Sequence, residues 1–190
     1  MGGQQDRERA AAIRAAAIVE EPRHRRLLRS PRDGRVLSGI MLRALALSTP
    51  PGHAVLTTVG CRSGRQRRNY VRAIRRRDKV YVVMLRPPAL AIRRPLAVSS
   101  WLWNVRADPG VRLRFGRRTF AGRAREISDP AELGQARAAI CETVHLMDYG
   151  ECLLHLRGLP SRKKIEDLHR YWFDTGVPLV IELAGQDSRA

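Results

Sequence analysis

The chain has 190 residues, with 36 Lys or Arg against 18 Asp or Glu, so its formal net charge is +18. Hydrophobic residues make up 44% of the sequence, which is enough for a buried core and excludes wholesale disorder. No apolar run is long enough for a membrane-spanning helix, and the first residues lack the apolar stretch of a secretory signal. The three cysteines form no C-x-x-C pair, which indicates a reducing, cytoplasmic setting.

The positive charge is concentrated in the middle third. Residues 60–125 hold 19 basic and 2 acidic residues, a net charge of +17, whereas residues 1–50 carry +5 and residues 126–190 carry −4. Arg accounts for 33 of the 36 basic residues, and its guanidinium suits bidentate binding of phosphate or carboxylate. Such a field attracts a polyanion, which is either nucleic acid, an anionic membrane or a small polyanionic ligand.

The N-terminal part of the chain predicts two helices joined by a basic linker. Residues 4–20 are Ala-rich and helix-prone, and residues 21–35 are basic and punctuated by Pro and Gly. Apolar residues then recur on one helix face over residues 37–47, at Leu37, Ile40, Met41, Ala44 and Leu45. That helix either packs on the core or lies on an anionic membrane surface. We expect residues 1–35 to form a basic, partly flexible extension.

From residue 53 the apolar period changes to two, which predicts strands. We expect strands at 53–60, 67–77 and 80–85, a hairpin over 111–127 that turns at Gly116-Arg117, and a buried strand at 177–183. Between them the sequence predicts a Pro-punctuated loop at 87–100, a short helix at 100–109, a helix from Asp129-Pro130 to about Met147, and a helix at 161–173.

This order of elements predicts an α+β fold, a split antiparallel β-barrel with peripheral helices. The strands do not alternate with long helices, and no G-x-G-x-x-G motif or P-loop occurs, so a doubly wound parallel sheet is disfavoured. We expect the barrel domain to span residues 36–185, with a disordered tail at 186–190. The strand at 177–183 is too apolar for an exposed sheet edge, which predicts a homodimer.

The most informative stretch, VLTTVGCRSGRQRR, covers residues 55–68. It reads as a strand, a turn bounded by Gly60 and Gly64, and the start of the next strand. Glycine permits positive φ and close backbone approach, and successive N–H groups in such a turn can form an anion nest. Ser63 supplies a hydroxyl, and Arg62 and Arg67 supply charge. On the residues alone, this stretch is either a phosphate or carboxylate site or a solvated basic loop.

Further candidates lie outside this turn. Trp101 or Trp103 either walls a ligand pocket or packs a helix on the barrel, and packing is favoured for Trp103. Tyr149 and His145 are candidate proton donors or lining residues of a substrate pocket. Four residues have spacings at which zinc could be chelated, but they match no standard site, so buried thiols and ordinary histidines are favoured; these are Cys141, His145, Cys152 and His155.

Four blocks in fixed order resemble the deazaflavin-dependent nitroreductase family. They are TTVGCRSGRQRRNYVRAI, then DKVYVV, then W-x-x-N-x-x-A-D-P-x-V-x-L, then R-T-F-x-G-R-A-R-E, within about residues 36–130. A weaker similarity lies at the terminal PLVIEL. Members of that family are split-barrel oxidoreductases, FMN-binding-like in fold, that use coenzyme F420.

The resemblance also implies site residues. It implies that an F420 phosphate binds at the turn and that the deazaflavin ring lies near the helix at 100–109. The implied cofactor-binding residues are Arg62, Ser63, Gly64, Arg67, Arg86, Trp101 and Asn104. The chain departs from the family pattern at Cys61, Gln66 and Asn69-Tyr70. Met84-Leu85 and the long following loop replace a small polar segment, which predicts an apolar cleft roof and a bulky hydrophobic acceptor.

The leading hypothesis is an F420H2-dependent reductase that transfers a hydride to an activated C=C, quinone or nitro group of a small hydrophobic organic substrate. FMN is the alternative cofactor, and no resident metal is expected. The alternative function is a split-barrel binding protein that holds FMN, haem or a hydrophobic ligand without redox chemistry. Nucleic-acid binding is disfavoured, because the sequence has no helix-turn-helix, zinc finger or aromatic RNP-like strand.

Overall fold

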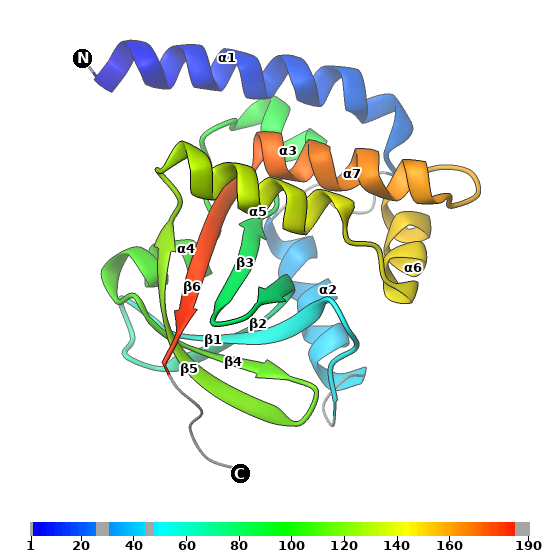
Figure 1. The fold of residues 1–190 in the computed structure, drawn as a ribbon. Helices are drawn as coiled ribbons and strands as arrows, with labels where there is room; N and C mark the ends of the chain where they lie inside the picture. The colour runs from blue at the N-terminus through cyan, green and yellow to red at the C-terminus, as the bar shows by residue number, and fades with distance from the viewer. Residues whose placement is uncertain (1, 26–30, 45–47, 185–190) are drawn as a thin grey trace.

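The computed structural model describes residues 2–25, 31–44 and 48–184, and its centre is a closed barrel of antiparallel strands (Figure 1). The strands run in the order β1-β2-β3-β6-β5-β4, and β4 closes the barrel by pairing with β1. Their bounds are β1 His53–Val59, β2 Gln66–Arg76, β3 Lys79–Met84, β4 Gly110–Phe115, β5 Arg118–Glu126 and β6 Val177–Leu183. This confirms the predicted barrel and both predicted hairpins.

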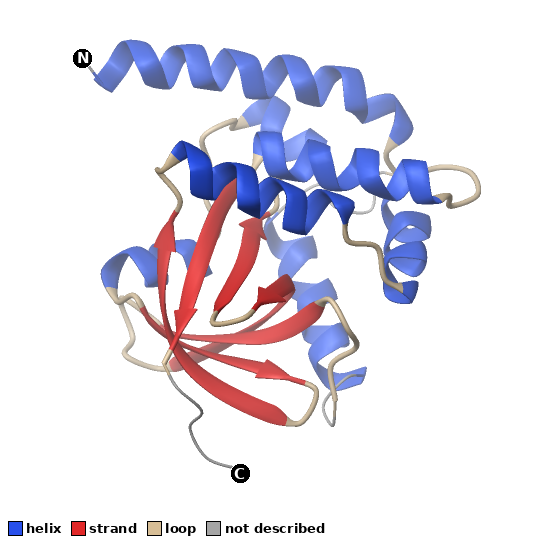
Figure 2. Ribbon diagram, viewed as in Figure 1, coloured by secondary structure: helices blue, strands red, loops and turns tan. Residues whose placement is uncertain are grey.

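Helices surround the barrel and form a layer at one end (Figure 2). In the described residues they are α1 Gly2–Glu20, η1 Glu21–Arg23, α2 Pro31–Ala44, α3 Pro88–Arg93, α4 Ser100–Ala107, α5 Pro130–Glu142, α6 Leu146–His155 and α7 Arg162–Thr175. α1 lies across this layer next to α3 and α7, and α5 packs between α7 and the barrel. None of these helices is long and apolar enough to cross a membrane.

Three apolar cores hold these layers together, and one of them lies between α5 and the outer face of the barrel, where Ile74 meets Ile140. Alternating side chains fill the barrel interior, among them Leu56, Val82 and Leu113. A second core lies among the helices, where Ile13 and Ala17 of α1 are buried with residues of α6 and α7. Apolar contacts therefore hold α1 against the other helices. Residues 26–30 of the expected extension and the expected tail at 186–190 lie outside the described residues.

β2 changes partners along its length, which makes the barrel a split one. Residues 66–72 pair with β1, and residues 73–76 pair with β3 on the other edge. α2 contacts β2, and Ser38 Oγ accepts a hydrogen bond from the backbone N–H of Tyr70 at 3.0 Å. Of the two positions predicted for the amphipathic helix, the structure therefore shows the packed one.

Residues 130–155 form two helices, so the prediction of one helix to about Met147 is wrong. α5 ends at Glu142, and α6 begins after His145, its N-cap residue. The His145 N–H donates to Asp148 Oδ2 at 2.6 Å, and the Asp148 N–H donates to the His145 carbonyl oxygen at 3.0 Å. Asp148 stabilises the start of α6 because its carboxylate satisfies a free backbone donor.

The segment after β3 also differs from the prediction. Residues 87–100 contain α3, whose Pro88 stands in the first turn, where a missing N–H costs nothing. Met84 is buried in the barrel interior, and Leu85 packs between the barrel and the helical layer. Neither residue forms the predicted cleft roof, so the expectation of a bulky acceptor loses its ground.

β6 lies between β3 and β5, where both of its edges are paired. We expected this strand to lie at an exposed edge and to be covered by a second copy of the chain. The closed barrel already buries it, so its apolar sequence gives no support for a homodimer.

Gly176, between α7 and β6, allows a close backbone approach. A Cβ there would lie 2.4 Å from the carbonyl oxygen of Trp172 and 2.5 Å from that of Met84. We expect Gly176→Ala to lower the free energy of unfolding by about 3 kcal/mol, because the two backbones must move apart. In α5, Gly134→Ala meets no atom within 4 Å and should raise it by about 0.5–1 kcal/mol. Chemical denaturation measures both, and equal stability of the two variants would contradict this packing.

Candidate functional site

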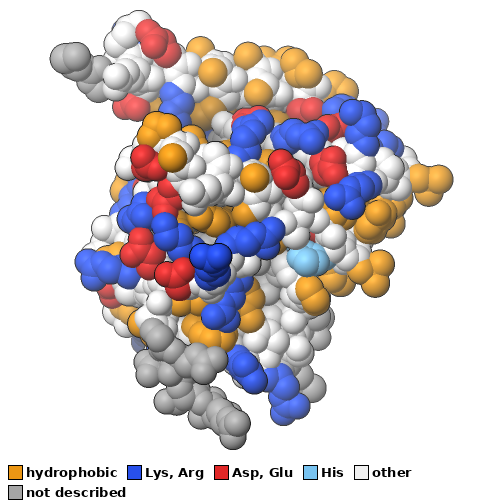
Figure 3. Space-filling model, in the orientation of Figure 1, with side chains coloured by type: hydrophobic (Ala, Val, Ile, Leu, Met, Phe, Trp, Pro, Cys, Tyr) orange, Lys and Arg blue, Asp and Glu red, His pale blue; other side chains and the backbone are white. Residues whose placement is uncertain are grey.

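The turn between β1 and β2 carries unpaired positive charge. Its four arginines are exposed, and none forms a salt bridge within the described residues; they are Arg62, Arg65, Arg67 and Arg68. Some arginines elsewhere pair with carboxylates, as Arg106 does with Glu126, whereas others, such as Arg117, do not; on the face in Figure 3 blue and red side chains adjoin over the helical layer. Unpaired guanidinium groups at one exposed turn suit an anionic ligand.

The backbone of this turn is closed by its own hydrogen bonds. The Gly60 carbonyl accepts from the N–H groups of Ser63 and Gly64, at 3.1 and 2.8 Å, and the Gly60 N–H donates to the Arg65 carbonyl at 2.9 Å. Gly64 has the left-handed conformation, with φ of +62°. The expected anion nest is wrong, because these donors already have acceptors. Anion binding is left to the arginine side chains and the Ser63 hydroxyl.

Asn104 of α4 holds this turn in place. Its Oδ1 accepts from the Cys61 N–H, and its Nδ2 donates to Thr58 Oγ1, each at 3.0 Å. The side chain is buried, and both its polar atoms are engaged. Asn104 therefore holds the turn in position from α4, a role that the W-x-x-N pattern alone did not reveal.

The two tryptophans of α4 have different environments. Trp101 packs against the barrel core, whereas Trp103 is 56% exposed, with the Arg106 guanidinium 5.3 Å from its ring centroid. The expectation that Trp103 packs on the barrel is wrong. Residues i and i+2 of a helix point in nearly opposite directions, so only one of the two can face the barrel.

Arg86 lies in the interior between β3 and α7. It is 1% exposed, and its guanidinium donates to the carbonyl oxygens of Ala97 and Thr175. Burial lowers the pKa of Arg86 to about 10. Because its N–H groups donate to backbone carbonyl oxygens, Arg86 can influence a ligand site only by holding these backbone segments in place.

His145 and Tyr149 lie together at the start of α6, away from the turn. The His145 ring adjoins Gly52, where a Cβ would lie 2.3 Å from its Cδ2, and burial lowers the pKa of His145. Tyr149 is 37% exposed and has no hydrogen bond within the described residues. Five positions of β2 separate Arg67 from Arg72, which contacts α6, and at about 3.3 Å per residue this is about 16 Å.

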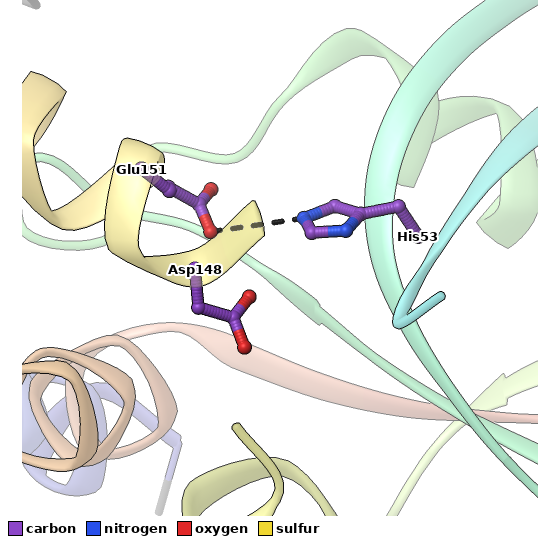
Figure 4. Close-up of side chains that lie close together, drawn as sticks. All are labelled: His53, Asp148 and Glu151. Atoms are coloured by element: carbon purple, nitrogen blue, oxygen red, sulfur yellow. Dashed lines mark ion pairs between the residues drawn. The ribbon is translucent and has the colours of Figure 1, made fainter. Parts of the chain in front are cut away.

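A buried polar cluster joins β1 and β2 to α6, and the sequence analysis missed it. Arg72 of β2 donates to Asp148 and to the Thr143 carbonyl, and His53 of β1 lies opposite Arg72. In Figure 4 the ring of His53 points toward Glu151, with 3.7 Å between Nε2 and Oε2. Burial by itself would raise the pKa of Glu151, but His53 and nearby cationic groups lower it to about 2.

Only part of that cluster had a signal in the sequence. The D-x-x-E spacing of Asp148 and Glu151 places both carboxylates on one helix face, but nothing local indicates the strand residues that meet them.

The zinc group considered from sequence does not form. Cys141 is buried between α5 and the barrel, whereas Cys152 is buried in the helical layer. His155 packs edge-on against Trp172, with ring centroids 5.0 Å apart. All three cysteines are free thiols. The four residues are close in sequence, but α5 and α6 bury the two cysteines in separate apolar cores.

Asn104→Ala tests the link between α4 and the turn. It leaves the Cys61 N–H without its acceptor and the Thr58 hydroxyl without its donor, so we expect a loss of about 1–3 kcal/mol of unfolding free energy. The exposed neighbour gives the control, because Trp103→Ala should change stability by no more than about 0.5 kcal/mol. Equal losses in thermal or chemical denaturation would exclude this role for Asn104.

A family model described as F420H(2)-dependent quinone reductase matches residues 45–150, more than half of the chain. The matched range includes the β1–β2 turn, α4, Arg72 and the start of α6. No match was found among curated proteins.

Several solved structures are similar at low sequence identity. One described as an F420-H2 dependent reductase (FDR-A) has a TM-score of 0.49 and 16% identity, over 71% of this chain and 97% of its own. One described as a domain-swapped dimer has a TM-score of 0.49 and 18% identity, over 80% and 100%. The heme storage protein HutZ from Vibrio cholerae has a TM-score of 0.41 and 15% identity, over 73% and 83%. These likenesses are too distant to carry an argument about function.

Proposed function

The chain belongs to the F420H(2)-dependent quinone reductase family and is an F420-dependent oxidoreductase; on this premise, we propose that its electron acceptor is a quinone. We further propose that F420 binds at the β1–β2 turn, and the group of arginines without salt bridges at this turn is the observation that supports this placement. Activated C=C and nitro compounds are the other acceptors to be tested, and FMN is the other cofactor.

The proposed cofactor contacts are made by side chains of the turn. F420 carries a phosphodiester and a γ-glutamate tail, and Arg62 and Arg67 offer guanidinium groups that suit both anions. Ser63 offers a hydroxyl, and Gly64 supplies the left-handed residue that shapes the turn. Asn104 supports the turn from α4, whereas Trp101 and Arg86 act through packing. The bound cofactor supplies the hydride.

The proposed proton donors lie at the other end of the β1–β2 pair. A cofactor held at the turn must extend along β2 for its ring to come near Tyr149. The partly exposed Tyr149 hydroxyl is the proposed donor to the reduced oxygen, and His145 is proposed to line the pocket because it is the N-cap residue of α6.

The decisive assay follows oxidation of F420H2 by the purified protein with a quinone, an activated alkene and a nitroaromatic as acceptors. Turnover that is fastest with the quinone supports the proposal. Tight F420 binding without turnover of any acceptor would make the chain a binding protein.

We keep a cytoplasmic location as part of the proposal; the contacts of α2 with β2 remove the main reason for membrane contact through that helix.

Replacing an arginine of the turn should weaken cofactor binding. Each charge-assisted contact contributes about 1.5–3 kcal/mol, so Arg62→Ala or Arg67→Ala should raise the dissociation constant of F420 by about 10- to 150-fold. The melting temperature should hardly change, because both side chains are exposed. Arg117→Ala removes the same charge from the exposed β4–β5 turn and serves as the control.

Titration calorimetry over several salt concentrations completes this test. If all three variants lose the same small amount of affinity, with a steep dependence on salt, the charge acts as a diffuse field typical of nucleic-acid binding. If Arg62→Ala and Arg67→Ala both bind F420 as tightly as the parent, the turn is not the cofactor site.

Tyr149→Phe tests the proton donor. Loss of a general acid lowers kcat by about 10²-fold or more, and we expect the lower end because water reaches this partly exposed hydroxyl. The F420 dissociation constant should be unchanged, since Arg67 lies about 16 Å along β2 from Arg72, the strand residue that contacts α6. Leu153→Ala, also exposed on α6, is the matched control and should keep the parent kcat. An unaltered kcat in Tyr149→Phe would assign proton delivery to solvent.

A further inference from the structure

We propose that His53, Glu151 and Asp148 form a binding site for a divalent metal ion of the Zn²⁺ type at the junction of β1 and α6 (Figure 4). Each residue offers one ligand atom, and these atoms all lie within 4.8 Å of one another. Imidazole nitrogen and carboxylate oxygen are both ligand types that zinc takes, and three protein ligands leave a fourth position for water. This group is the one set of three such residues in the described part of the chain.

The orientation of His53 suits a ligand. Its Nδ1 lies 3.3 Å from the carbonyl oxygen of Pro51, which can only accept, so Nδ1 carries the proton. The ring also stacks on Tyr70, with centroids 5.1 Å apart and planes within 8°. A backbone carbonyl on the far nitrogen is the outer contact typical of metal-binding histidines. It leaves Nε2 to meet Glu151, and Figure 4 shows this nitrogen directed at the Glu151 carboxylate.

The charge balance of the cluster also points to a cation. Arg72 neutralises Asp148, whereas Glu151 has no Lys or Arg partner within the described residues. Glu151 Oε2 is buried and has no hydrogen bond. It faces Nε2 of His53 at 3.7 Å, so these two atoms are placed to bind one cation between β1 and α6.

The distance between His53 Nε2 and Glu151 Oε2 fits a bridging metal ion better than a hydrogen bond. Nε2 and Oε2 are 3.7 Å apart, longer than the 2.7–3.2 Å typical of an N–H···O hydrogen bond. Bonds of about 2.0–2.2 Å to one zinc ion place two ligand atoms about 3.4 Å apart at a tetrahedral angle. His53 and Glu151 are thus within a few tenths of an ångström of that spacing. Asp148, whose oxygens also accept from Arg72 and from the His145 N–H, lies within 4.8 Å of both as the third ligand. The ion would tie α6, which carries Tyr149, to the barrel.

The test uses the full chain, without an affinity tag, after removal of bound metal. Cys61→Ser serves as the background, because an exposed thiol binds zinc independently. Calorimetry with Zn²⁺ should show one site per chain, with a rise in melting temperature. His53→Gln and Glu151→Gln should each weaken binding about tenfold or more. Glu126→Gln, a carboxylate outside the cluster that pairs with Arg106, should leave binding unchanged.

Cobalt gives a second measurement that does not depend on the folding of the variants. Co²⁺ bound to this background should show the visible bands of a nitrogen and oxygen site without a thiolate charge-transfer band, and Zn²⁺ should displace it. Absence of stoichiometric Zn²⁺ binding at 100-fold excess over the protein would overturn the proposal and leave His53 and Glu151 as a proton-sharing pair. A thiolate band, or unchanged affinity in both variants, would also overturn it.

Discussion

The buried guanidinium of Arg72 decides how the helices meet the barrel. A charge removed from water must be matched by groups in fixed positions, and Arg72 meets the Asp148 carboxylate and the Thr143 carbonyl oxygen. These acceptors are the start of α6 and the residue that follows α5. One strand residue therefore sets where α5 stops and how α6 is oriented. The place of Tyr149 and Glu151 depends on it in turn.

Arginine has two roles in this protein, and the availability of acids separates them. The basic middle third folds against the acidic last third, where Arg125 pairs with Glu132 and Glu182, and Arg106 with Glu126. Part of the positive charge of the middle third is thereby neutralised. Four arginines without a salt bridge in the described residues lie close together at the exposed β1–β2 turn, namely Arg62, Arg65, Arg67 and Arg68. Other exposed arginines, such as Arg117 and Arg118 at the β4–β5 turn, also lack a salt bridge there, so the β1–β2 turn is distinguished by the grouping of its arginines.

Local patterns predicted the elements whose cause is local. Alternating side chains indicated five of the strands and a continuous apolar run indicated the sixth, and Asp129 caps α5 as its position before Pro130 suggested. The errors lie where a distant residue decides. α6 begins after His145, where Asp148 is held by Arg72. Met84 turns inward because β3 is a strand of the closed barrel, and Val80, Val82 and Met84 are on its interior face. The apolar strand at 177–183 was placed correctly and misread as an edge, since its second neighbour, β5, comes from far along the chain.

The sequence by itself determined the strand pattern, the anion-attracting turn and, through its motifs, the F420 family, because these depend on residues adjacent in the chain. Only the tertiary structure decided that Asn104 supports the turn, that Arg86 is interior, and that His53 meets Glu151 across β1 and α6. Such contacts join residues from 43 to about 100 positions apart. No local spacing encodes them, because the closing of the barrel and the seating of α6 bring these residues together.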